Sequence, residues 1–246
     1  MAADIEQLAK QWERLGHEDA LWAILSEPQR RGGGWTAREF FETGRHEIER
    51  TLLRLAEFAT PAQGRALDFG CGVGRLTQAL AEHFEEADGV DISSSMIEQA
   101  RQFNRHGKRC RYHHNPVSDL SLFEDAQFDF VMSAITLQHV RPDYIKRYLR
   151  EFARVLKPGG LLYFQLPIGN SRDSRGLFYR LMPPRLLSTL FRLKHGYEIY
   201  EMHAIPRKSV IAILHNAGLE VLDAGEDPSA GAGWIGQRYL ARRRLT

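Results

Sequence analysis

A glycine-rich loop and a nearby acid are the residues of this sequence whose spacing most clearly indicates chemistry. Gly70, Gly72 and Gly74 follow a short apolar segment and precede a helical one. Glycines let a loop turn sharply and bring its backbone close to a ligand at the carboxyl end of a parallel strand. Asp91 ends the next apolar segment, where an acid can accept hydrogen bonds from both hydroxyls of a ribose. The loop and the acid together predict a cofactor that contains a nucleoside.

The spacing of these glycines differs from the Gly-x-Gly-x-x-Gly pattern of nicotinamide-binding loops. A third glycine in that pattern would stand where the sequence has Arg75 or Thr77, depending on the register. Asp68, in front of the loop, would repel a pyrophosphate and attract a cationic amine or sulfonium. A nicotinamide-dependent oxidoreductase is therefore disfavoured, and measurable NAD(P) binding would revive it.

Four segments in a fixed order carry a resemblance to a known family. They are Asp-Phe-Gly-Cys-Gly-Val-Gly-Arg at 68–75, Gly-Val-Asp-Ile-Ser at 89–93, Phe-Asp-Phe-Val-Met-Ser at 128–133 and Arg-Val-Leu-Lys-Pro-Gly-Gly at 154–160. This ordered set resembles the class I S-adenosylmethionine-dependent methyltransferases of the small-molecule type. The resemblance covers residues 46–166 well and the C-terminal strands more loosely. It implies S-adenosylmethionine as the cofactor and S-adenosylhomocysteine as the product.

The resemblance also assigns roles to single residues. The backbone of the glycine loop would pass along the methionine part of the cofactor, Asp68 would orient its amine, and Asp91 would hold its ribose. Ile92 and Met96 would pack on the adenine. The cofactor-binding residues implied in this way are Asp68, Gly70, Cys71, Gly72, Gly74, Asp91, Ile92, Met96, Asn115, Val117, Asp119, Ser133 and Ala134.

The segment expected to contact the adenine rim departs from the family pattern. The family often has an acid followed by a small residue there, and this chain has Pro116 and Val117. We expect Asn115 or Asp119 to replace the acid, with the Val117 amide facing a ring nitrogen.

Methyl transfer from a sulfonium is an in-line displacement that requires the acceptor atom close behind the methyl group and the exclusion of water. A base is needed only when the acceptor must lose a proton. His139 follows the fourth strand and is the candidate base, with Tyr144 as a second candidate and Tyr200 and His203 as weaker ones. The alternative is that His139 only shapes the cleft or contacts the cofactor. No metal-ligand pattern is present, and Cys71 is more typical of a packing residue.

Strand-like and helix-like segments alternate between residues 46 and 166, which predicts an α/β fold with a doubly wound, mostly parallel sheet. Ser95 and Glu98 are interpreted as a capping box that opens one helix. The resemblance implies a Rossmann-like sheet of seven strands with the last strand antiparallel. The expected strands are 65–68, 89–91, 110–113, 128–132, 161–166, 219–223 and 235–242, and the expected helices are 74–84, 95–106, 143–156 and 207–217.

Two further zones flank this alternating part. Residues 1–45 are rich in large aromatic side chains around a Gly-Gly-Gly hinge and predict an N-terminal helical cap, which could act as a lid. The domain proper is expected over 46–246, with an insertion at 167–207 before the sixth strand. The insertion is apolar and basic. It is interpreted as a roof over a substrate pocket, and contact with a membrane surface through 176–194 is the alternative.

Composition narrows the class of protein. The chain has 246 residues, a net charge of +2 and two cysteines, so neither a disulfide framework nor nucleic-acid binding is expected. We expect a cytoplasmic enzyme, because the N-terminus lacks the pattern of a secretory signal. The predicted function is methyl transfer to a small-molecule acceptor, at oxygen first, with nitrogen or carbon open. An RNA or protein methyltransferase and a non-catalytic S-adenosylmethionine-binding module remain alternatives, and neither the acceptor nor the oligomeric state can be predicted.

Overall fold

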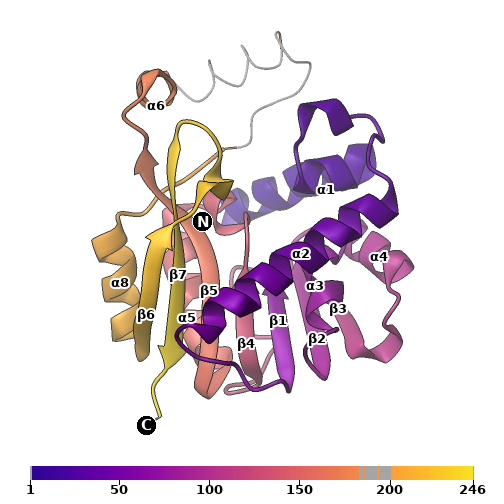
Figure 1. Ribbon diagram of the computed structural model, residues 1–246. Coiled ribbons are helices and arrows are strands. Elements are labelled where there is room, and N and C mark those ends of the chain that lie inside the picture. Colours follow the sequence, from indigo (N-terminus) through magenta and orange to yellow (C-terminus); the bar gives the residue numbers. More distant parts are fainter. Residues whose placement is uncertain (1, 183–185, 187–192, 194–200, 246) are drawn as a thin grey trace.

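A single sheet of seven strands organises the computed structural model, which describes residues 2–182, 186, 193 and 201–245. The strand order is β3-β2-β1-β4-β5-β7-β6 (Figure 1). Strands β1 to β5 pair in parallel, and β7 is antiparallel to both β5 and β6. The expected seven-stranded sheet with an antiparallel last strand is confirmed. The strands are β1 (Arg65–Phe69), β2 (Glu86–Asp91), β3 (Cys110–His114), β4 (Phe128–Ser133), β5 (Leu156–Asn170), β6 (Leu219–Glu226) and β7 (Trp234–Arg243).

Helices cover both faces of the sheet, as the alternation of segments predicted. On one face, Phe152 of α5 and Val210 of α8 belong to a core with the sheet, and on the other Ile48 of α2, Leu80 of α3 and Ile97 of α4 do. The helices are α1 (Ala2–Ile24), α2 (Ala37–Ala56), α3 (Arg75–Leu80), α4 (Ser94–Phe103), α5 (Pro142–Val155), α6 (Ser174–Leu181) and α8 (Arg207–Asn216). Short 3-10 turns are η1 (Pro28–Arg30), η2 (Gly107–Arg109), η3 (Leu137–His139) and η4 (Pro228–Ala230).

Several helix boundaries differ from expectation, and α3 ends at Leu80 and α4 at Phe103, before the expected residues 84 and 106. The N-cap residue of α4 is Ser93, whose side chain accepts a hydrogen bond from the backbone N–H of Met96. The capping box predicted at Ser95 is therefore wrong. The reason is that Asp91 turns the chain by accepting the Ser93 amide, so the helix begins at residue 94. Helix α5 ends at Val155, and the Pro-Gly-Gly stretch after it lies inside β5.

The N-terminal segment folds back on the glycine loop and on α4. Helix α1 lies across one end of the sheet in Figure 1 and is kinked at Asp19. The Asp19 carboxylate accepts hydrogen bonds from the amides of Gly32 and Gly33 at 2.7 and 3.1 Å, which fixes the glycine turn. The boundary expected between residues 45 and 46 falls inside α2, which runs through it without a break.

The region expected as an insertion is partly described. It begins with the end of β5 and helix α6, and residues 183–185, 187–192 and 194–200, with the candidate Tyr200, lie outside the described residues. The chain returns beside η3, where the His203 amide donates to the carbonyl of Gln138 at 2.7 Å. In the described part of the chain, every helix is too short or too polar to cross a membrane.

Candidate active site

A cavity of about 580 Å³ opens at the carboxyl ends of β1, β2 and β4. The glycine loop and the ends of these strands form one side, and α1 with the segment that follows it forms another. The turn η3 and residues near positions 202 and 230 complete the wall. This is the position at which open parallel sheets bind ligands. The cavity has the size of a small-molecule or cofactor site.

The glycine loop forms a close-fitting edge of this cavity. Gly70 and Gly72 line it with φ angles of 77° and 52°, values that favour glycine. A Cβ at Gly70 would overlap the side chain of Thr136, and one at Gly72 would lie 2.5 Å from Ile24 of α1. This conformation of the loop therefore requires glycine at both positions.

Asp91 is held beside this loop by backbone amides. One carboxylate oxygen accepts from the Gly72 amide at 2.8 Å, and the other accepts from the Ser93 amide at 2.9 Å. Burial raises the pKa of Asp91, and the two amides oppose that shift by stabilising the charged form. The carboxylate therefore faces the cavity in one fixed orientation.

The structure brings together most of the residues that the sequence predicted for cofactor binding. The cavity is lined by Gly70, Gly72, Asp91, Ile92, Met96, Asn115 and Ala134, together with the candidate base His139. Because these residues come from four separate segments, their convergence depends on the parallel order of the strands.

Other predicted residues lie outside the cavity lining. Asp68 is buried and accepts a hydrogen bond from the Thr77 hydroxyl at 2.7 Å, and burial raises its pKa to about 7. Ser133 is buried and donates to the carbonyl of Phe69. Their cofactor contacts stay predictions. The predicted residues that do not line the cavity are Asp68, Cys71, Gly74, Val117, Asp119, Ser133 and Tyr144.

The two residues expected to replace the missing acid near the adenine have different surroundings. Asn115 lines the cavity, and its side chain donates to the carbonyl of Asp119 at 2.6 Å. The Asp119 carboxylate instead pairs with Arg147 at 2.9 Å, and hydrogen bonds from Ser121 help to hold its pKa below the usual value. Asn115 is thus placed to contact a ligand, whereas Asp119 is engaged on the protein surface.

His139 lies on the cavity wall with both ring nitrogens in contact with polar groups. Its Nδ1 lies 3.1 Å from the carbonyl oxygen of Glu201, which can only accept, so Nδ1 carries the proton. Its Nε2 is then an acceptor and lies 3.2 Å from the side-chain nitrogen of Gln138. Burial lowers the pKa of His139 to about 4, so the ring is neutral at physiological pH. Chemically, this side chain can accept a proton or a hydrogen bond inside the cavity.

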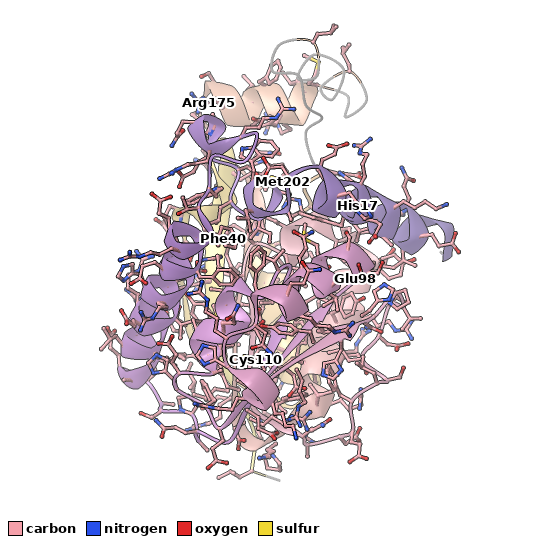
Figure 2. The ribbon with its side chains drawn as sticks, turned by 90° about the vertical axis from the view of Figure 1, so that its right-hand side faces the viewer. His17, Phe40, Glu98, Cys110, Arg175 and Met202 are labelled. Atoms are coloured by element: carbon pink, nitrogen blue, oxygen red, sulfur yellow. The ribbon has the colours of Figure 1, made fainter. Side chains whose placement is uncertain are left out.

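Several lining residues were missed by sequence reasoning. Leu8 and Trp12 reach the cavity from α1, and the Trp12 ring packs edge-on against His139 with centroids 5.5 Å apart. Met202, labelled in Figure 2, comes from the returning segment and lines the same cavity as Trp12. The aromatic content of the N-terminal zone was a signal for a cap, but no local pattern indicates which cavity a distant helix will cover.

Comparisons with known proteins agree with this geometry. A family model described as a methyltransferase domain matches residues 67–164. The ubiquinone biosynthesis O-methyltransferase of Coxiella burnetii is 36% identical over 182 residues, which are 72% of this chain and 73% of that protein. The protein of the same name from Bordetella avium is 32% identical over 168 residues, 68% of this chain and 66% of that protein. A solved SAM-dependent methyltransferase from Methanosarcina mazei superposes with a TM-score of 0.59 at 22% identity, covering 78% of this chain and 98% of that chain.

Proposed function

Because this chain belongs to the class I S-adenosylmethionine-dependent methyltransferases, we propose that it methylates a hydroxyl oxygen of a small, uncharged acceptor. The reaction takes place in the cavity between the glycine loop and α1. Gly70, Gly72 and Asp91 would hold the cofactor, since all three line the cavity and the Asp91 carboxylate is fixed beside the loop.

The lining of the cavity is the observation that carries the proposal. Apolar side chains dominate it, and among the described lining residues none is Lys or Arg. Its acidic members are Asp91 and Glu27. A carboxylate or phosphate on the acceptor, buried there, would lose hydration without gaining a cationic partner among the described residues. This supports an uncharged acceptor and speaks against RNA as the substrate.

The choice of oxygen is supported by two observations. The two curated relatives described above are named O-methyltransferases of ubiquinone biosynthesis. In addition, His139 presents an acceptor nitrogen at the cavity wall, which suits a hydroxyl that must lose its proton. An amine that attacks through its own lone pair would not need this group before transfer.

The chain's own residues then have separate tasks. When bound, S-adenosylmethionine supplies an electrophilic methyl group on a sulfonium. His139 Nε2 takes the hydroxyl proton of the acceptor, and Trp12 fixes the ring of His139 by edge-on contact. Helix α1 excludes water from the cavity, which favours attack by the bound oxygen over side reactions.

Calorimetric titration tests the cofactor site first. S-adenosylhomocysteine and NAD(P) are titrated into the wild type, Asp91→Asn and the control Asp143→Asn, whose parent side chain is 81% exposed. We expect Asp91→Asn to weaken S-adenosylhomocysteine about tenfold or more and the control to match the wild type. A well-folded wild type that binds only NAD(P) would contradict the proposal.

An acceptor screen tests the substrate class. Mass spectrometry follows methylated product from S-adenosylmethionine with phenols, catechols, aliphatic amines, aromatic carboxylates and RNA. We expect product from uncharged hydroxyl compounds. Product from carboxylates or RNA alone would overturn the proposed class while leaving the cofactor site intact.

A further inference from the structure

Gln138 is a buried polar residue on the cavity wall, and only one of the two polar atoms of its side chain has a hydrogen-bond partner among the described residues. It belongs to η3, is 5% exposed and lines the cavity. Its side-chain nitrogen donates to Nε2 of His139, and its backbone carbonyl accepts the amide of His203. Its side-chain oxygen is buried and has no hydrogen-bond partner among the described residues.

The orientation of this amide follows from the state of His139. The Glu201 carbonyl places the proton of His139 on Nδ1, so the lone pair on Nε2 needs a donor. The Gln138 nitrogen supplies it, and a flipped amide would set its oxygen against that lone pair. The Gln138 oxygen is therefore left without a donor among the described residues, which is unfavourable for a buried acceptor.

A ligand that rearranges the pair can supply this oxygen with a donor. A hydroxyl that donates to Nε2 of His139 replaces the Gln138 nitrogen there and frees the Gln138 amide. The freed oxygen then accepts a hydrogen bond from a second donor on the same ligand. Two hydroxyls on neighbouring carbon atoms would supply both donors from one ligand.

We propose that Gln138 is a specificity-determining residue that covers His139 Nε2 in the free enzyme and binds a second hydroxyl of the acceptor, next to the one that is methylated. This inference rests on the proposed function, because it takes His139 as the group that meets the reacting hydroxyl. The fixed backbone of Gln138, hydrogen-bonded to His203, keeps its side chain beside His139 throughout.

The test compares catechol with phenol, which lacks the second hydroxyl. Initial rates are measured for the wild type and for Gln138→Met, a variant of similar size without polar atoms. We expect the wild type to prefer catechol in kcat/KM, and we expect Gln138→Met to lower that value for catechol about tenfold, the worth of one hydrogen bond. The value for phenol should change less than the value for catechol, so the ratio of the two values should fall.

A second variant separates recognition from a merely structural role. Gln138→Glu places a carboxylate against His139 and raises its pKa, so the acid limb of the pH-rate profile should move to higher pH. Thermal unfolding and S-adenosylhomocysteine affinity of both variants serve as folding controls. An unchanged catechol-to-phenol ratio in Gln138→Met, or equal losses for both compounds, overturns the proposal.

A binding experiment tests the proposal if neither catechol nor phenol is methylated. Catechol is then titrated into the wild type and Gln138→Met, each saturated with S-adenosylhomocysteine. Binding that Gln138→Met weakens supports the proposal, and absent binding rejects it. Failure of the proposed function is seen separately, as absent transfer to every uncharged hydroxyl compound in the acceptor screen.

Discussion

Glu13 in the N-terminal helix and Ser93 before α4 are joined by a hydrogen bond, with the Ser93 hydroxyl donating to the Glu13 carboxylate at 2.8 Å. The same carboxylate accepts from the Ser94 hydroxyl and from the Ser95 amide, both at 3.1 Å. Because the Ser93 amide donates to Asp91, this serine links the helix that covers the cavity to the acid beside the glycine loop.

Weakening this link should loosen the cover over the cofactor. Glu13→Gln removes the charge from the bonds to the serines, so we expect S-adenosylhomocysteine affinity to fall about three- to tenfold. Amides of α1 should exchange hydrogen faster than in the wild type. The control is Glu18→Gln, on the same helix, whose parent side chain is 63% exposed. Equal affinity and exchange for both variants would show that the link does not hold the helix.

The pH-rate profile should reveal the environment of His139. Its pKa of about 4 means that the ring stays neutral, and ready to accept a proton, down to about pH 5. Single-turnover rates should therefore lack an acid limb near pH 6.5 that depends on His139. His139→Ala should slow transfer about a hundredfold or more. Full turnover with an unchanged pH profile in His139→Ala would remove the role as a base.

Asp68 should make the protein less stable as the pH rises. Burial raises its pKa from the usual 3.8 to about 7 in the folded protein, so protonation favours folding. Its contribution is present below about pH 4 and is lost as the pH rises through 7. Asp68→Asn cannot ionise, so its stability relative to the wild type should improve by about 2–3 kcal/mol between pH 5 and pH 8. Urea unfolding at the two pH values measures this difference.

The Asp68→Asn variant also bears on the role that the resemblance gives to this residue. A loss of S-adenosylmethionine affinity of tenfold or more would support an interaction with the cofactor amine. A pH-independent stability difference would instead contradict the raised pKa.

Asp88, in contrast to Asp68, should make the protein more stable as the pH rises. Burial alone would raise its pKa, but His113 at 2.7 Å and Arg65 at 2.6 Å lower it to about 2. The folded state thus favours the charged form, and about 2 kcal/mol of stability present above pH 4 is lost as the pH falls towards 2. Asp88→Asn should destabilise the protein at pH 7 by at least this amount, because Arg65 loses its ion pair and His113 loses its carboxylate hydrogen-bond partner.

Unfolding of Asp88→Asn is compared with that of Asp143→Asn at pH 7 and pH 3. The Asp88 variant should differ from the control strongly at pH 7 and less at pH 3. A constant difference across this range would mean that the charge of Asp88 contributes little.

The parts of the fold that depend on local sequence could be predicted. The glycines at 70 and 72 and the acid at 91 follow strands, and parallel strands bring their ends together, so the convergence of these residues follows from topology. Contacts that depend on which of several partners a side chain pairs with could not be predicted. Asp119 pairs with Arg147 rather than facing the cavity, and nothing near either residue in the sequence indicates that pair.

The same limit applies to contacts between distant segments. The helix that begins the chain was expected as a cap, but its hydrogen bond to Ser93 joins residues 80 positions apart in the sequence. The start of α4 is a local example of this limit. The Ser93 amide donates to Asp91, and the N-cap is Ser93 rather than the predicted Ser95.

The walls of the cavity have different origins along the chain, and this has an evolutionary consequence. Gly70 and Asp91 lie within the segment that matches the family model, whereas Trp12 and Met202 lie outside it. Substitutions in the outer segments can reshape the surroundings of His139 while the glycine loop is inherited unchanged. Descendants of one such enzyme can therefore diverge in what they methylate without ever losing methylation itself.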